Sequence, residues 1–146
     1  MVHDFKQFPE LNNNQMNFYY FESPHTQITE DFSGIVVDVH DGDTIKVKWA
    51  QREKPINVRM NGIGAPELDE EGGIESRNWL TSRLLNNTVD ILIDEDNRVG
   101  KWGRIIGTVI CQGMDVNQES IAFGFSMDYD EWLEEQSALK VGVLEI

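Results

Sequence analysis

Residues 34–49 read GIVVDVHDGDTIKVKW, and this stretch decides the fold. An apolar run at 34–40 leads into the turn Asp41-Gly42-Asp43-Thr44, and apolar and polar residues alternate after it over 44–50. This pattern predicts a β-hairpin, because Asp can bond its own backbone and Gly accepts positive φ in a turn. A turn needs only one acid, so the second carboxylate indicates oxygen ligands for a hard cation such as Ca²⁺.

Further elements follow the hairpin. Apolar residues alternate at 56–60, 89–94 and 104–110, which predicts three more strands. Helical patterns cover 74–85 and 116–123, and a last helix begins near residue 130. This order is typical of a small closed Greek-key barrel. Residues 34–146 are therefore predicted to form an α+β, mainly β domain, a five-stranded OB-type barrel with about three helices.

Residues 1–33 differ from the rest and are predicted to form an irregular N-terminal arm. They contain the dense aromatic cluster Phe18-Tyr19-Tyr20-Phe21 without a sustained helical or strand period. Two interpretations stay open. The aromatic rings cover the core of the domain itself, or they dock on a protein partner or a neighbouring subunit.

Composition narrows the class of protein. The 146 residues are enough for one domain, and 40% hydrophobic and 26% charged residues are typical of a globular fold. No apolar run approaches the roughly 20 residues that span a bilayer, and the start lacks a secretory pattern. We therefore expect no membrane partner and an intracellular or virion-associated location. The single cysteine, Cys111, excludes an internal disulfide and is expected to be a buried, inert thiol.

The net charge of −14 argues against loose adhesion to nucleic acid, which normally needs a basic surface. A nucleic-acid substrate would have to be held by a few well-placed cations. Lys46, Lys48, Arg52 and Lys54 cluster near the second strand and could line a groove that binds oligonucleotides without cleaving them.

Four motifs, in this order, resemble the staphylococcal nuclease (thermonuclease) family over about residues 34–129. They are Asp41-Gly42-Asp43-Thr44, the run 58–67 (VRMNGIGAPE), Lys101-Trp102-Gly103-Arg104, and Val116-Asn117 before a helix that ends in Gly124-Phe125. The resemblance implies a five-stranded OB barrel with three helices, in agreement with the pattern of elements.

The resemblance also implies roles for individual residues. Arg59 and Arg104 would hold the scissile phosphate, and Glu67 would be the general base. Asp43 would be the first Ca²⁺ ligand, Asp41 an outer-shell acid, and Tyr129 a looser match to a tyrosine of the substrate pocket. These roles suit phosphodiester hydrolysis, because guanidinium groups clamp phosphate and a carboxylate can accept the proton of water.

One position departs from the family pattern. Gly64 stands where the family usually has an Asp that is the second side-chain metal ligand. Ca²⁺ prefers six to eight oxygens, so divalent-metal binding should be weak here. Asp69, Glu70 and Glu71 could substitute for the missing ligand, or they form a solvated acidic loop.

Two main functions follow. The first is a metal-assisted phosphodiesterase, an endonuclease that acts on single-stranded or flexible DNA or RNA and is weakened by Gly64. The alternative is an inactive module of the same fold that serves as a structural subunit in a multi-subunit complex or a virus particle.

Overall fold

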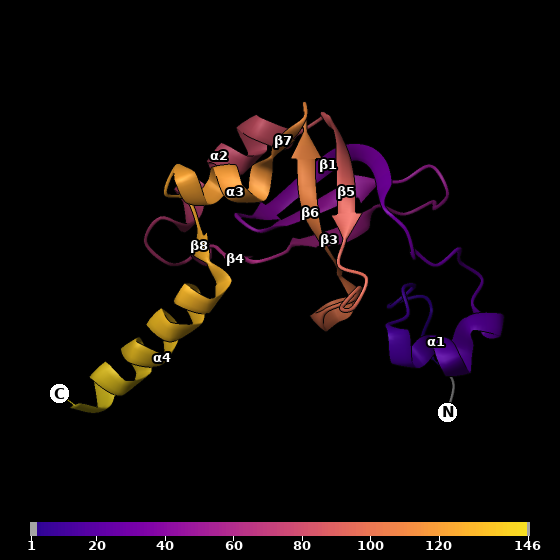
Figure 1. Cartoon of the computed structure of the whole chain (residues 1–146), viewed down its shortest axis with the longest axis horizontal. Helices are drawn as coiled ribbons and strands as arrows, with labels where there is room; N and C mark the ends of the chain where they lie inside the picture. The colour runs from indigo at the N-terminus through magenta and orange to yellow at the C-terminus, as the bar shows by residue number, and fades with distance from the viewer. Residues whose placement is uncertain (1–2, 146) are drawn as a thin grey trace.

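The structure, a computed structural model, describes the backbone of residues 3–145 and the side chains of residues 3–138. Five strands form a closed barrel: β1 (Phe32–Asp41), β2 (Thr44–Lys48), β3 (Ile56–Met60), β5 (Thr88–Ile93) and β6 (Ile105–Cys111) (Figure 1). The order is β3-β2-β1-β5-β6 with antiparallel neighbours, and a parallel pairing of β3 with β6 closes the barrel. The predicted mainly β barrel is confirmed.

The barrel core is built from the alternating side chains of the strands. Along β3, Ile56, Val58 and Met60 are buried, while Asn57 is exposed. The same alternation recurs in β5 and β6. Helix α2 (Gly73–Leu84) adds Leu80 and Leu84, both fully buried, to this core. Since strand side chains point to opposite faces in turn, the polar residues of β3 are left outside the core.

The C-terminal elements position one wall of the later site. Short strand β7 (Met114–Asp115) pairs antiparallel with the end of β6 and precedes α3 (Val116–Ala122). Two-residue strands β4 (Ile63–Gly64) and β8 (Met127–Asp128) then pair, and α4 (Tyr129–Glu145) begins directly after β8. Figure 1 shows α4 projecting away from the barrel. The start of α4 is thus tied to the strand that follows β3.

The N-terminal segment, residues 3–31, is not irregular throughout, contrary to the prediction. It contains α1 (Asn13–Tyr19) and a single 3₁₀ turn, Tyr20–Glu22. Asn12 caps α1 and exchanges hydrogen bonds with Gln15, a capping-box pattern that the sequence interpretation missed. The predicted boundary at residues 33/34 stays a prediction, with β1 beginning at Phe32.

The aromatic cluster does not cover the core. The side chains of Phe18 and Phe21 are 78% and 100% exposed, whereas Leu11 and Ile28 of the same segment are buried. Docking of the aromatic rings on a protein partner stays a prediction.

Two composition-based expectations can be compared with the structure. Cys111 is fully buried, as expected for an inert thiol. Within residues 3–145, no helix combines the length and the apolar character needed to cross a membrane.

Candidate active site

The predicted site residues all line one cleft of about 820 Å³, which lies between the outer faces of β2 and β3, the start of α4 and the turn before β6. The residues that the sequence singled out and that meet here are Asp41, Asp43, Arg59, Glu67, Arg104 and Tyr129. The fold therefore brings together motifs that lie far apart in the sequence.

Arg59 is held in place before any ligand arrives. It stands on the outer face of β3, where Nη1 donates to the carbonyl of Met60 at 2.7 Å and Nη2 donates to the carbonyl of Ile63 at 2.8 Å. Nη2 also lies 3.4 Å from Oδ2 of Asp43. Because a guanidinium carries five N–H donors in a fixed fork, donors remain for a ligand in the cleft.

Asp43 is a buried carboxylate at the end of the β1–β2 turn. Oδ2 accepts the backbone N–H of Ala65 at 3.0 Å, and Oδ1 accepts the hydroxyl of Thr44 at 3.1 Å. The pKa of Asp43 is raised to about 6, because burial, together with the neighbouring Asp41, outweighs the opposing charge of Arg59. Two close carboxylates of this kind are stabilised in their charged form by a cation.

Gly42 serves the turn for a reason other than the predicted one. The glycines with positive φ do not include Gly42. A β-carbon at Gly42 would lie 2.0 Å from Oγ of Ser76 and 2.7 Å from Cβ of Ala65. Glycine is needed because the turn packs closely against α2, and this close contact places Asp43 in the cleft.

The opposite wall of the cleft is the turn Lys101–Gly103 and the residue after it. Arg104 Nη1 donates to Oγ1 of Thr44 at 3.2 Å, and Nε donates to the carbonyl of Lys101 at the same distance. Trp102 is 74% exposed and has φ of 65°. Lys101 and Trp102 also line the cleft, as does Trp132 of α4. Sequence reasoning quoted the first two within a motif but gave no part to their side chains.

Glu67 lies on the exposed loop that follows β4. Its backbone N–H donates to Oε1 of Glu70 at 2.8 Å, which closes a turn before α2. The Glu67 side chain lines the cleft, but the residues that line it do not include Asp69, Glu70 or Glu71. Of the four acids on this loop, Glu67 is the one placed at the site.

Comparison with known proteins agrees with the resemblance to the staphylococcal nuclease family. The model of the family described as staphylococcal nuclease homologue matches residues 57–141. The chain belongs to this family. It is 34% identical over 103 residues to an uncharacterized endonuclease of Escherichia coli, a match that covers 70% of this chain and 64% of that protein. It is also 34% identical over 79 residues to a micrococcal nuclease of Shigella flexneri, covering 54% and 42%. The chain thus spans less than two thirds of the length of these relatives.

Within the staphylococcal nuclease homologue family, Gly64 is the informative departure. The resemblance implies a metal-binding carboxylate at this position. Here a β-carbon at Gly64 would lie 2.4 Å from Cγ of Trp132. The indole therefore occupies the space that a side chain at position 64 would need, and the chain has no room there for the carboxylate that the resemblance implies.

The remaining residues fit a divalent cation only in part. Among residues 3–138, no group of three or more His, Cys, Asp or Glu side chains gathers as a metal cage would. Asp41 and Asp43 form one close pair that a cation would stabilise. The donor set thus fits one cation held by two carboxylates, with the other ligands supplied by backbone and water, which favours weak binding.

The four cations of the predicted basic groove do not all face one surface. Arg52 is buried and paired with Glu10, with Nη2 2.9 Å from Oε2. Lys48 Nζ donates to the carbonyl of Arg52 at 2.9 Å. Of these four cations, Lys46 lines the cleft and the other three do not.

Proposed function

We propose that the chain is a nucleic-acid phosphodiesterase that cleaves DNA or RNA internally in this cleft. The observation that carries the proposal is the convergence of Arg59, Arg104 and Glu67 around Asp43 in one cleft. The nuclease names of the relatives point to the same class of reaction.

The two arginines would bind the phosphate in different ways. Arg59 is fixed by two backbone carbonyls, so its guanidinium loses little further freedom when a phosphate binds. Arg104 is bonded to a hydroxyl and to the carbonyl of Lys101, and it would close on the phosphate from the other wall. Together they would stabilise the negative charge that builds up on the phosphate oxygens in the transition state.

Glu67 would act as the general base. Its exposed side chain lines the cleft and is open to water, whose proton a carboxylate can accept as the oxygen attacks phosphorus. A divalent cation held by Asp41 and Asp43 would supply additional positive charge near the phosphate. Ca²⁺ is the ion that the resemblance implies, with affinity reduced by Gly64.

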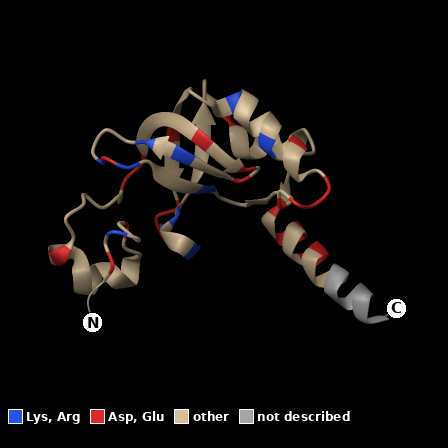
Figure 2. Cartoon of the chain, turned by 180° about the vertical axis from the view of Figure 1, so that it is seen from behind, with Lys and Arg blue, Asp and Glu red and all other residues tan. Residues whose placement is uncertain are grey.

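The acidic residues at the start of α4 would favour a flexible nucleic acid over a rigid one. Asp130, Glu131, Glu134 and Glu135 are exposed along the first turns of α4, where Tyr129 and Trp132 line the cleft. Figure 2 shows acidic residues along this part of α4. They would repel a bulky, rigid polyanion, while a single strand can bend toward Lys101 and Arg104 on the other wall. We therefore propose single-stranded or flexible nucleic acid as the substrate. The structural-module alternative is not favoured by the nuclease-named relatives.

The test is cleavage of single-stranded DNA and RNA in Ca²⁺, in Mn²⁺ and in a chelator. The Glu67→Gln and Arg104→Ala variants should each lower kcat by about 100-fold or more. Arg83→Met is the matched control, since it breaks an ion pair with Glu119 (2.9 Å) away from the cleft and should retain activity. If the wild-type protein cuts neither polymer faster than an Arg59→Ala, Glu67→Ala double variant in any metal, the proposal is wrong.

A further inference from the structure

The N-terminal segment joins the barrel through a buried charged junction that the proposed reaction does not use. Glu10 is 2% exposed, and its two oxygens each lie 2.9 Å from a guanidinium: Oε1 from Arg98 and Oε2 from Arg52. Arg52 comes from the loop between β2 and β3, and Arg98 from the β5–β6 loop, residues 94–104. A charge buried this deeply is retained only where its partners are fixed, so the junction holds three segments in one geometry.

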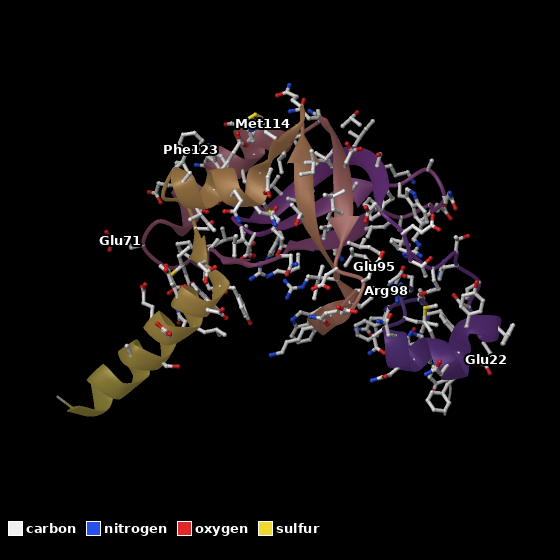
Figure 3. All side chains as sticks on the ribbon, in the orientation of Figure 1. Glu22, Glu71, Glu95, Arg98, Met114 and Phe123 are labelled. Atoms are coloured by element: carbon white, nitrogen blue, oxygen red, sulfur yellow. The ribbon has the colours of Figure 1, made fainter. Side chains whose placement is uncertain are left out.

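Arg98 is the centre of this junction. Nε donates to the carbonyl of Ile28 at 2.7 Å, and Nη1 donates to the carbonyl of Leu11 at 3.0 Å and to Oδ1 of Asn13 at 3.1 Å. Oε1 of Glu10 also accepts the N–H of Ile28 at 2.6 Å. One guanidinium therefore binds the N-terminal segment both at the start of α1 and at Ile28, after it. Figure 3 shows Arg98 and Glu95 where the loop after β5 meets that segment.

The same segment contacts the β5–β6 loop at two further points. Asn13 Nδ2 donates to the carbonyl of Glu95 at 3.1 Å, near the start of the loop. Near its end, the ring of Phe8 comes within 3.3 Å of the place where a β-carbon at Gly103 would lie. The loop is thus held at its beginning, middle and end by residues 8–13.

The β5–β6 loop also carries one wall of the cleft. Lys101, Trp102 and Arg104 line the cleft, three to six residues after Arg98. Trp102 has φ of 65°, a backbone conformation that a bulky residue adopts only when its surroundings impose it. The hydrogen bonds Gly100 N–H to Arg104 O (2.8 Å) and Ile106 N–H to Arg98 O (2.9 Å) close the loop on its barrel side.

We propose that the N-terminal segment positions the substrate cleft: Glu10 and Arg98 are positioning residues that, with Phe8, hold the β5–β6 loop so that Arg104 faces the phosphate. The effect of this positioning on catalysis rests on the proposed function. The ordering of the loop by the N-terminal segment does not depend on that function. An arginine that loses its alignment by about 1 Å can cost about 100-fold in rate even when the change lies outside the reacting atoms.

The structural part is tested by hydrogen–deuterium exchange of the full chain. Arg98→Met removes the centre of the junction, and Phe8→Ala removes the contact on Gly103 while leaving all charges in place. In both variants the amides of Gly100 and Ile106 should lose protection. Arg83→Met, the matched control, removes a guanidinium that pairs with Glu119 and bonds the last residue of β6, at the end of that strand away from the loop, and it should leave the loop protected. If Arg98→Met does not fold, the exchange of Gly100 and Ile106 in Phe8→Ala still tests the proposal.

Activity then separates the two proposals. In a cleaving wild-type protein, Arg98→Met and Phe8→Ala should lower kcat, by up to about 100-fold for Arg98→Met, with little change in KM. Folded variants with wild-type exchange at Gly100 and Ile106 would overturn the positioning role, whatever the activity. Lost protection in a chain that never cleaves nucleic acid would overturn the proposed function and leave the positioning of the loop intact.

Discussion

The indole of Trp132 lies over the α-carbon of Gly64, so closely that a β-carbon there would stand 2.4 Å from Cγ and 2.7 Å from Cδ2 of the ring. The pairing of β4 with β8 causes this contact, because it brings the start of α4 against β4. Glycine at position 64 and tryptophan at position 132 are therefore two parts of one packing arrangement.

This relationship predicts the effect of adding the missing ligand. Gly64→Asp alone should destabilise the protein, because the new side chain overlaps the indole. Gly64→Asp combined with Trp132→Gly should fold and bind Ca²⁺ more tightly than the wild type, because the glycine also removes the Trp132 β-carbon, 2.8 Å from the new one, and one carboxylate is added next to Asp43. Isothermal titration calorimetry measures the affinity. Trp132→Gly alone is the control, since it opens the space without adding a ligand. A Gly64→Asp protein as stable as the wild type would contradict the packing described above.

Replacing Arg59 and replacing Arg104 should affect the stability of the protein differently. Arg59→Ala leaves the carbonyls of Met60 and Ile63 without a charged donor, and it should lower the free energy of unfolding by about 1.5–3 kcal/mol as well as abolish cleavage. Arg104→Ala removes hydrogen bonds that are longer and more exposed than those of Arg59. It should change the free energy of unfolding by less than about 0.5 kcal/mol while activity falls. Urea unfolding of both variants checks this difference. Equal losses of stability would argue against the fixed position of Arg59.

Gly42→Ala tests the contact between the acidic turn and α2. The added methyl would stand 2.0 Å from Oγ of Ser76, so we expect a loss of about 1–3 kcal/mol in the free energy of unfolding. Asp43 should move with the turn, and cleavage should fall further than stability accounts for. Adding Ser76→Gly should restore part of both, although Ser76 also donates to the carbonyl of Phe125. No recovery in the double variant would mean that Ser76 is not the obstacle.

Cys111 should resist thiol reagents in the native protein. Its side chain is fully buried in the barrel core, so a chromogenic disulfide reagent should react only as fast as the protein opens. In guanidinium chloride the same reagent should modify one thiol per chain at once. Rapid reaction of the folded protein would show that β6 is more accessible than described.

The strands and the site could be predicted because their signals are local. Alternation placed Val58 inside the barrel and Arg59 outside it, and the order of four short motifs brought Arg59, Glu67 and Arg104 to one cleft. The spacing of Asn12 and Gln15 was a readable sign of α1 that was overlooked.

Other features have no local signal. Glu10 and Arg98 are 88 residues apart, and nothing near either one indicates that they form a buried pair. Likewise, Gly64 could be recognised as a missing ligand, but Trp132 in its place depends on how α4 packs against β4. Gly42 was assigned to turn geometry, whereas its reason is the proximity of Ser76, which only the tertiary structure provides.

The parallel pairing of Val58 with Ile105 has a consequence for solubility at high concentration. Because it joins β3 to β6, each of the five long strands has a neighbour on both sides, so none offers an open edge to another molecule. Apolar segments such as Thr88–Ile93 would otherwise be suited to edge-to-edge association and fibril growth. Breaking this single three-residue ladder should therefore promote aggregation before the rest of the barrel unfolds.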